Sequence, residues 1–379
     1  MPPHPAVPFL DLNRQIHPLQ SDLENAFRKV TRNGSFILGP EVRSFEAEFA
    51  RFCSVRYGIG VASGTDALEL SLRALGIGSG DRVATVSFTF MATVDAIRQV
   101  GAEPLFVDID PSTYTLDPKD LERKISTLSR SERSRLKAVL PVHLYGHPAD
   151  MEGIGRIARR YRLKIVEDAA QAAGAFWKGR PVGSFGTAAC FSFFPTKNLG
   201  GLGDAGLILT SSRLLDQRLR SLRIHGRSNG ELQKVLGRNS RLDELQAAFL
   251  RVKLRRLKGW VNLRRFWAAE YTRRLSRVAF IGCPVQARGA RHVFHLYVIR
   301  SPRRERIRKV LEREGIASRV YYERPVHRQP LHWEIGRRFS LPQTDRACRE
   351  VLALPLFPEL QKKELVRVCE VIASVKEKP

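Results

Sequence analysis

From Tyr57 to about Thr210 the sequence alternates short apolar runs, rich in β-branched residues, with amphipathic helical patterns. Each apolar run has the length of a buried strand. The strand-like runs are YGIGVA, RVATVSF, PLFVDI, KAVLPVH, LKIVEDA, AACFSFF and GLILTS. The helical patterns between them include Asp66–Leu75, Met91–Val100 and Met151–Arg162. This alternation predicts an α/β fold, a mainly parallel sheet covered by helices on both faces, with ligands bound at the carboxyl ends of the strands.

The sequence pattern changes after about Arg213. Long basic helical patterns lead to the strand-like HLYVIR at His295–Arg300, and a helix–strand stretch and a final helix follow. These helical patterns are Leu214–Arg223, Leu242–Leu257 and Arg264–Leu275. A chain of 379 residues has room for two domains. We expect a large α/β domain over residues 1–245 and a smaller C-terminal α+β domain over residues 246–379.

The chain is strongly basic, with 64 Lys and Arg against 38 Asp and Glu, and a net charge of +26. Seven of the basic residues lie between Arg251 and Arg265, where they alternate with apolar residues such as Leu254 and Leu257. This helical spacing indicates one packed and one solvated face. No helix-turn-helix, zinc-finger or aromatic–basic RNA signature accompanies it, so we do not expect nucleic acid as a partner.

Apolar stretches in this sequence are no longer than a strand, well short of the roughly 20 residues that a membrane-spanning helix needs. The first residues show no basic segment followed by a long apolar run, so we expect no secretory signal and a cytoplasmic location. The five cysteines are scattered without a CxxC pair or a Cys/His cluster. We therefore expect no metal site, and free thiols in a reducing compartment.

Three segments carry polar residues where the local pattern predicts burial. In the first, VASGTDALEL, a strand-like run ends in Ser63-Gly64-Thr65 and an amphipathic helix begins at Asp66. Glycine lets the backbone approach a ligand, and the free amides at a helix N-terminus favour an anion such as a phosphate. The alternative is an ordinary helix N-cap formed by Thr65 or Asp66.

In the second segment, LKIVEDAAQAAGA, Asp168 lies at the end of a strongly apolar strand. A carboxylate in that position is costly unless it meets a cation. Gln171 follows three residues later, within reach of the same pocket. The alternative is that Asp168 caps the next helix.

In the third segment, AACFSFFPTKNLGGLGDAG, Lys197 follows an apolar strand and precedes four glycines. A lysine held at the edge of an apolar core tends to have a lowered pKa, so it is a candidate nucleophile for a carbonyl group and would form a Schiff base. Ser192 lies five residues earlier and offers a hydroxyl to an anion. The string GLGDAG leads into a strand rather than opening a helix, which argues against a dinucleotide site.

Together, a carbonyl-reactive lysine, a buried carboxylate and a phosphate cradle match the needs of pyridoxal 5'-phosphate. Its aldehyde requires an amine, its ring nitrogen an anionic partner, and its phosphate a helix N-terminus. An aromatic side chain over the ring is expected too, and Phe88 and Phe90 in VSFTFMAT are both candidates.

The sequence resembles the DegT/DnrJ/StrS-type sugar-nucleotide aminotransferases, a pyridoxal phosphate family with the fold-type I architecture. The resemblance runs from VPFLDL at Val7 to LPLFPEL near Leu360. It is carried by FILGPEV, SGTDAL, PVHLYGHPADM, EDAAQA, FSFFPTKNLGGLGD and NSRLDELQAAFLRVKL. Within the family, the wording is most similar to the dTDP-3-keto-6-deoxyhexose 3-aminotransferases.

The resemblance implies a role for each matching residue. Lys197 corresponds to the lysine that binds the cofactor covalently and shuttles the proton, and Asp168 to the partner of the ring nitrogen. Gln171 corresponds to the residue near the phenolic oxygen, and Phe90 to the stacking aromatic. The phosphate cradle corresponds to Gly64, Thr65 and Ser192. Asn239 corresponds to an asparagine that reaches the phosphate of the neighbouring subunit, which implies a homodimer with shared active sites.

The family transfers the amino group of L-glutamate to a ketosugar nucleotide. This chain departs from the family's wording at Ala173, where many relatives have histidine, and at two further places. Arg238 replaces a tyrosine common before Asn239, and RVYYERPVHRQP replaces the usual HYP-x-PLHLQP wording. Arg238, Tyr321 and His327 are the residues at which we expect substrate contacts. The alternatives are a 4-keto sugar-nucleotide aminotransferase and a non-catalytic regulatory relative. A pyridoxal dehydratase would carry histidine in place of Lys197.

Overall fold

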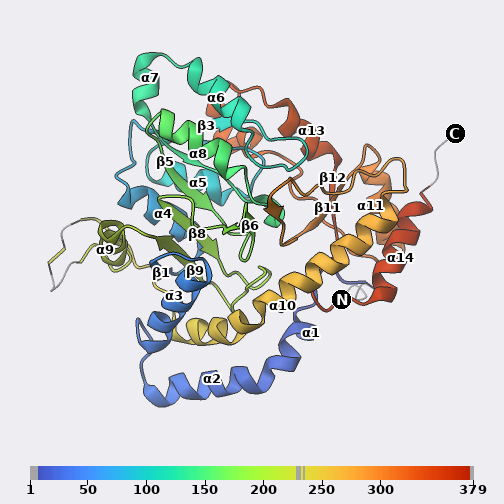
Figure 1. Cartoon of the computed structure of the whole chain (residues 1–379), viewed down its shortest axis with the longest axis horizontal. Helices are drawn as coiled ribbons and strands as arrows, with labels where there is room; N and C mark the ends of the chain where they lie inside the picture. Colours follow the sequence, from blue (N-terminus) through green and yellow to red (C-terminus); the bar gives the residue numbers. More distant parts are fainter. Residues whose placement is uncertain (1–6, 228–231, 234, 376–379) are drawn as a thin grey trace.

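The computed structural model describes residues 7–227, 232–233 and 235–375, and it has the predicted α/β architecture (Figure 1). Seven strands form the central sheet in the order β1-β9-β8-β5-β4-β2-β3. Their bounds are β1 Tyr57–Val61, β2 Arg82–Val86, β3 Glu103–Val107, β4 Leu136–Leu140, β5 Lys164–Asp168, β8 Ala188–Ser192 and β9 Gly206–Thr210. Each predicted apolar run thus supplies one strand. Only β9 runs antiparallel to its neighbours, so the sheet is mainly parallel, as predicted.

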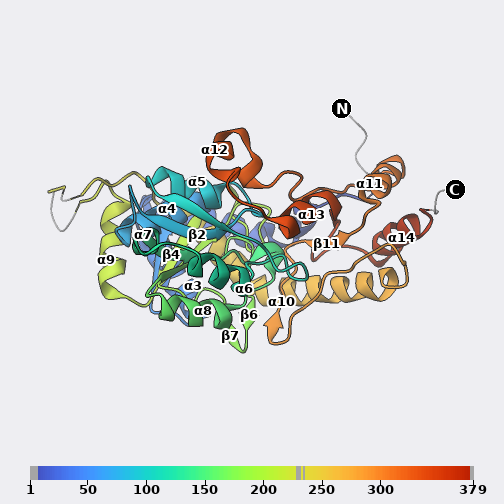
Figure 2. The same cartoon turned by 90° about the horizontal axis from the view of Figure 1, so that it is seen from above.

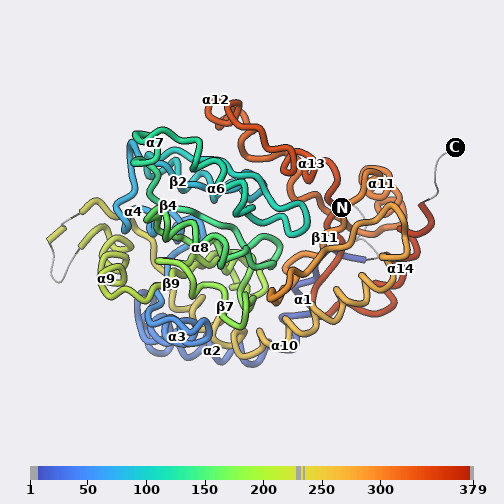
Figure 3. The backbone as a smooth tube through the Cα atoms, turned by 45° about the horizontal axis from the view of Figure 1, so that its top comes forward, coloured from blue at the N-terminus to red at the C-terminus, as the bar shows by residue number. Residues whose placement is uncertain are grey.

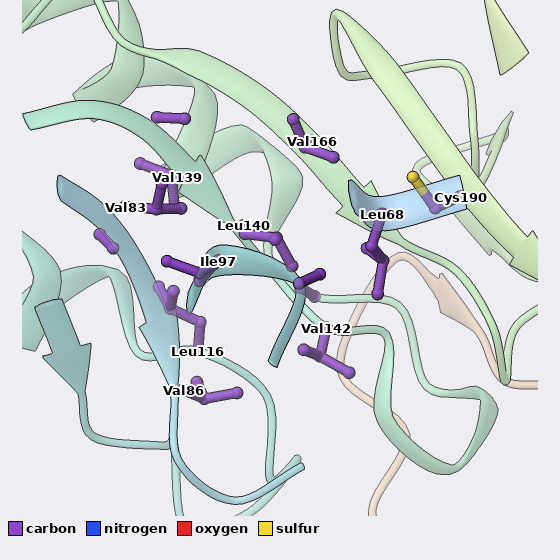
Figure 4. Packing of buried hydrophobic residues seen from close by; sticks show 14 of the residues in the cluster. Leu68, Val83, Val86, Ile97, Leu116, Val139, Leu140, Val142, Val166 and Cys190 are labelled. Carbon is purple, nitrogen blue, oxygen red and sulfur yellow. The ribbon is translucent and has the colours of Figure 1, made fainter. Parts of the chain in front are cut away.

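Helices cover both faces of this sheet, as the alternation of side chains along β9 shows. Ile208 belongs to the same apolar core as Leu68 of α4 (Gly64–Ala74), whereas Leu207 belongs to a second core with Phe49 of α3 (Pro40–Phe52). Figure 4 shows part of the first core, in which strand and helix side chains meet. The other helices of this part are α5 Ala92–Gln99, α6 Pro118–Ser126, α7 Arg130–Arg135, α8 Met151–Arg160 and α9 Arg213–Leu222.

One long helix, α10 (Glu244–Leu275), connects the sheet to the C-terminal part (Figure 1). The prediction of two helices over residues 242–257 and 264–275 was wrong, because the segment between them is helical too. It contains no proline, and its single Gly259 costs only about 1 kcal/mol relative to alanine. Burial of Trp260 and Val261 offsets that cost. α10 contacts α2 (Gln20–Asn33) and α3, and also α14 (Lys362–Ala373).

The C-terminal part has its own apolar core, which includes Tyr271 of α10, Tyr297 and Leu354. Tyr297 and Leu354 face each other in an antiparallel pair of strands, β11 (Tyr297–Arg300) and β12 (Val351–Leu354). The elements around this pair are α11 Arg304–Arg313, α12 Trp333–Gly336, α13 Pro342–Glu350 and α14. Figure 2 shows α12 on the opposite side of the molecule from α10. The predicted domain boundary at residue 245 falls in the first turn of α10, and the division at that residue stays a prediction.

Three further strands, β6 (Phe176–Trp177), β7 (Arg180–Pro181) and β10 (Ala290–Arg291), form a small separate sheet. It ties the loop after β5 to the segment that precedes β11. The short helix α1 (Leu12–Ile16) has Asp11 as its N-cap, and the Asp11 carboxylate accepts a hydrogen bond from the amide of Asn13. In Figure 3, α9 lies at one end of the molecule, and α11 and α14 lie at the other.

Two findings bear on the function classes. Among the residues that the structure describes, none of the helices combines the length and apolar composition that crossing a bilayer requires. In the same residues, no group of three or more histidine, cysteine or acidic side chains is arranged to hold a metal ion. All five cysteines are free, and Cys283 is the one that is only partly buried.

Candidate active site

A cavity of about 750 Å³ lies where the carboxyl ends of β5 and β8 meet the N-terminus of α4. It brings together most of the residues predicted from the sequence: Gly64, Thr65, Phe90, Asp168, Gln171, Ser192, Lys197 and Tyr321. Residues that the sequence analysis did not select also line it, among them Thr93, Arg264, His295, Arg319 and Tyr322. The cavity is therefore the candidate active site.

The N-terminus of α4 forms one wall of the cavity. Ser63 is its N-cap, and the Ser63 Oγ accepts a hydrogen bond from the Asp66 amide at 3.1 Å. The alternative of a cap at Thr65 or Asp66 was wrong, because the helix begins at Gly64, two residues earlier than the sequence pattern indicated. The amides of Gly64 and Thr65 have no intrahelical partner at this position, so they can bind an anion.

Gly64 allows this wall to touch the end of β8. A Cβ atom on Gly64 would lie 2.6 Å from the Cβ of Ser192, too close for any other residue without movement of the backbone. Within the described residues, the Ser192 Oγ accepts only a long hydrogen bond, 3.4 Å from the Phe194 amide, so its proton remains available. Two free amides, a hydroxyl and the positive end of the helix dipole meet here, and they fit a phosphate group.

Asp168 ends β5 and is only 5% exposed. Its Oδ2 accepts a hydrogen bond from the Thr93 hydroxyl at 2.8 Å, and its Oδ1 accepts one from the Ala170 amide at 3.2 Å. Burial raises the pKa of Asp168, although both hydrogen bonds and the nearby Lys197 oppose that effect. A turn rather than a helix follows, so the alternative of a helix cap was wrong. A buried carboxylate in this position fits a cationic ring nitrogen.

Lys197 lies in the loop between β8 and β9. Burial lowers its pKa to about 8, although the Asp168 carboxylate acts in the opposite direction. At neutral pH this lysine therefore has a larger fraction of neutral amine than an exposed lysine. The neutral amine is the form that attacks an aldehyde, so the position fits covalent attachment of a carbonyl cofactor.

The two aromatic candidates differ in their surroundings. Phe88 is fully buried, and its ring contacts those of Tyr114, Tyr145 and Tyr322. Phe90 lines the cavity and is 52% exposed. Phe90 is thus the aromatic side chain that can stack on a planar ligand.

Gln171 is held in one orientation by two hydrogen bonds. Its Oε1 accepts from the Tyr145 amide at 2.7 Å, and its Nε2 donates to the Tyr322 hydroxyl at 3.2 Å. Tyr322 is a contact that the sequence analysis missed, although it stands next to the predicted Tyr321. Thr93 was missed as well, and the available signal was a polar residue on the buried face of the predicted helix Met91–Val100.

Three predicted residues do not line this cavity. Asn239 is exposed and lines a second cavity of about 320 Å³, which shares Asp204 with the first. The guanidinium of Arg238 forms ion pairs with Asp66, at 3.1 Å, and Glu69. His327 is buried, and its Nδ1 lies 2.7 Å from the Ser87 hydroxyl. The structure gives no support to a substrate contact by His327, because burial keeps that side chain away from the cavity.

The cavity residues fit pyridoxal 5'-phosphate as a set. Gly64, Thr65 and Ser192 would hold the phosphate, Asp168 the ring nitrogen, and Lys197 the aldehyde carbon, with Phe90 against the ring. The fit depends on groups without another partner in the described residues, namely the helix N-terminus and the Lys197 amine.

Comparisons with known proteins agree with this geometry. The model of the DegT/DnrJ/EryC1/StrS aminotransferase family matches residues 18–373. A "pleiotropic regulatory protein" of Geobacillus stearothermophilus is 44% identical and covers 97% of this chain and 98% of its own. A dTDP-3-amino-3,4,6-trideoxy-alpha-D-glucose transaminase of Streptomyces venezuelae is 42% identical, with coverage of 97% and 96%. The crystal structure of S. venezuelae DesV in complex with a ketimine intermediate has a TM-score of 0.94 and 41% identity, and covers 99% of this chain and 100% of its own.

Proposed function

The chain belongs to the DegT/DnrJ/EryC1/StrS aminotransferase family, and we propose that it transfers the amino group of L-glutamate to a dTDP-linked 3-keto-6-deoxyhexose. It is a pyridoxal phosphate-dependent aminotransferase. The observation that carries the proposal is the convergence of Lys197, Asp168 and the α4 N-terminus on one cavity. The 3-keto sugar is supported by the similarity to the S. venezuelae transaminase and to DesV.

Each residue has a distinct task in this proposal. Pyridoxal phosphate, when bound, supplies an electron sink for the carbon that carries the amino group. Asp168 keeps the ring nitrogen protonated, because a buried carboxylate favours a cation as its partner. The amides of Gly64 and Thr65 and the Ser192 hydroxyl hold the phosphate. The Nζ of Lys197 would attach the cofactor and, when free, would carry the proton between the two carbon atoms on either side of the transferred nitrogen.

The sugar would enter from the side of the cavity that Tyr321 and Arg319 line. The backbone of Arg319 is fixed by two hydrogen bonds to Ala353, and its guanidinium is exposed, donating only to the Ser318 carbonyl in the described residues. This guanidinium is available for an anionic part of a substrate, whereas the Nη1 of Arg264 already donates to backbone carbonyls. A small change in the sugar's position could select the 4-keto isomer instead, since about 1 Å of misplacement costs roughly a hundredfold in rate.

The proposal includes a homodimer with shared active sites. The exposed Asn239 lies in the cavity next to the candidate active site, where a second chain could be reached. Phe36 and Ile37 are more than 40% exposed and lie close by, because Ile37 pairs with Asp243 at the start of α10. Exposed apolar side chains next to a polar site are typical of a protein interface. We also propose a cytoplasmic location, in which the five free thiols stay reduced.

The test is turnover of a panel of dTDP- and UDP-linked 3-keto and 4-keto sugars with glutamate, and structure determination of the product. Amination at C3 of a dTDP-6-deoxyhexose supports the proposal, whereas turnover of the 4-keto isomers alone overturns it. Borohydride reduction and peptide mapping should find the pyridoxyl group on Lys197. A protein that binds no cofactor and turns over none of the sugars would be the regulatory relative instead.

A further inference from the structure

His295 lines the wall of the candidate active site and is only 9% exposed. Its Nδ1 lies 3.3 Å from the Oδ1 of Asn198, the residue that follows Lys197. The imidazole is thus fixed against the loop that carries the reactive lysine.

The hydrogen bonds around Asn198 determine the tautomer of His295. The Asn198 Nδ2 donates to the Val293 carbonyl at 3.3 Å, and a carbonyl can only accept. The amide oxygen of Asn198 therefore faces His295, so Nδ1 carries the proton and donates. Burial and the neighbouring Lys197 and Arg264 keep the pKa of His295 well below 6.5. The ring is neutral at physiological pH, and its Nε2 carries a free lone pair.

This lone pair needs a donor, and the cavity offers few. In the part of the chain that the structure describes, no side chain or amide donates to the Nε2 of His295. Arg264 is nearby, but its Nη1 already donates to the carbonyls of Leu356, at 2.8 Å, and His295, at 3.3 Å, and its Nε, which has no partner in the described residues, is fully buried. The amine of Lys197 lines the same cavity and has no hydrogen-bond partner in the described residues.

We infer that the Nε2 of His295 accepts a hydrogen bond from the Nζ of Lys197 whenever that amine is not attached to the cofactor. His295 is thus a positioning residue, and its role rests on the proposed role of Lys197. His295 holds the released Lys197 amine in a fixed position, and from that position the amine transfers the proton. Asn198 supports this arrangement by fixing the tautomer.

The effect of His295 on the pKa of Lys197 adds to the effects of the other groups around this lysine. Asp168 on β5 favours its ammonium form, whereas burial disfavours it. Arg264 on α10 lines the same cavity. The acceptor at His295 stabilises the N–H groups of the ammonium, so its loss should lower the pKa of Lys197 by about half a unit to one unit. Without this acceptor the released lysine is less well positioned, so proton transfer should be slower and kcat should fall roughly tenfold.

Two substitutions of His295 distinguish the role of Nδ1 from that of Nε2. His295→Asn keeps a donor toward Asn198 but has no atom at the position of Nε2. His295→Gln places an amide oxygen near that position and loses the bond to Asn198. In the cofactor-free protein, the pKa of Lys197 is measured from the pH dependence of its acetylation, followed by mass spectrometry. In the loaded protein, absorbance titration, kcat and the KM for glutamate are measured.

The expected result is a lowered pKa of Lys197 and a reduced kcat in His295→Asn, an unchanged KM, and values within about twofold of the parent in His295→Gln. Equal values in both variants would overturn the inference, as would an unchanged pKa of Lys197 in His295→Asn. The acetylation experiment requires no turnover, so its outcome is independent of which sugar the enzyme uses. Pyridoxyl labelling of another lysine would instead overturn the proposed role of Lys197.

Discussion

The hydroxyl of Thr93 lies 2.8 Å from the Oδ2 of Asp168 and donates a hydrogen bond to it. The Thr93 oxygen also lies 2.8 Å from the hydroxyl of Thr89, and both threonines are buried. Thr93 belongs to α5, which follows β2, whereas Asp168 ends β5. A helix from one strand–helix unit thus orients the carboxylate that another unit supplies.

Thr93→Val removes this donor while keeping nearly the same volume. The hydrogen bond lowers the pKa of Asp168, so its loss should raise that pKa further and weaken the carboxylate as a partner of the ring nitrogen. We expect the first half-reaction with glutamate to slow by roughly tenfold, as about 1–2 kcal/mol of interaction is lost. Stopped-flow absorbance measures the rate of this half-reaction. Thr93→Ser keeps the hydroxyl and serves as the control, and equal rates in both variants would contradict the role of Thr93.

Gly64→Ala should weaken cofactor binding by about tenfold or more, because the added Cβ would lie 2.6 Å from the Cβ of Ser192 and push the two phosphate-binding walls apart. Gly259→Ala in α10 is the matched control, since its Cβ meets no atom within 4 Å. That change should stabilise the protein by about 0.5–1 kcal/mol and leave cofactor binding unchanged. Equilibrium dialysis and thermal unfolding test both variants. Unaltered affinity in Gly64→Ala would argue against the close contact.

The rate at which the cofactor-free protein takes up pyridoxal phosphate should depend on pH through Lys197. Burial lowers the pKa of this lysine to about 8, so its neutral amine is the minor form below that pH and the major form above it. Uptake should therefore accelerate about tenfold per pH unit at low pH and level off above about 8. Asp168 holds the pKa up, so in Asp168→Asn the midpoint should move to lower pH. A midpoint near that of an exposed lysine would refute the burial of Lys197.

A mixture of two inactive chains tests whether Asn239 works across a dimer interface. Lys197→Ala removes the reactive amine, and a disabling Asn239 substitution removes the contact from the other chain. Hybrid dimers should regain part of the activity, because one of their two sites receives both intact residues. Light scattering checks the oligomeric state. A fully active monomer, or hybrids with no activity although each variant folds, would contradict a shared site.

Glu46 connects α3 to β1 and α9 in the interior. It accepts hydrogen bonds from Arg223 at 2.6 Å, Arg220 at 2.9 Å and the Gly60 amide at 2.8 Å, and it is 4% exposed. Glu46→Ala leaves the buried Arg223 without its carboxylate, so we expect a loss of about 3–5 kcal/mol in the free energy of unfolding.

The exposed pair Glu122–Arg160 provides the control for Glu46. Its N–O distance is 2.7 Å, yet both side chains are largely solvated, so Glu122→Ala should cost less than about 1 kcal/mol. Urea unfolding of both variants measures the difference. Similar losses in the two would show that the buried network does not stabilise the fold.

The sequence predicts a large part of the fold and site from local patterns. All seven strands of the central sheet coincide with apolar runs of strand length, because a strand buried on both faces must be apolar throughout. Lys197 and Asp168 were found because polar groups after buried strands are costly without a partner. Resemblance selected Phe90 over Phe88, and it added Asn239, which periodicity does not distinguish from an ordinary surface residue.

Local pattern alone determined the strands, most helices and the reactive residues of this protein, since hydrophobic periodicity and strand ends depend on neighbours in sequence. Tertiary structure decided what those residues touch. Thr93 and Asp168 are 75 residues apart, and Asn198 and His295 are 97 apart, so their pairing depends on how the sheet and the C-terminal part pack. The same holds for the continuity of α10 and the burial of Phe88 rather than Phe90. These contacts join residues that are far apart in the sequence, so a short segment of sequence cannot predict them.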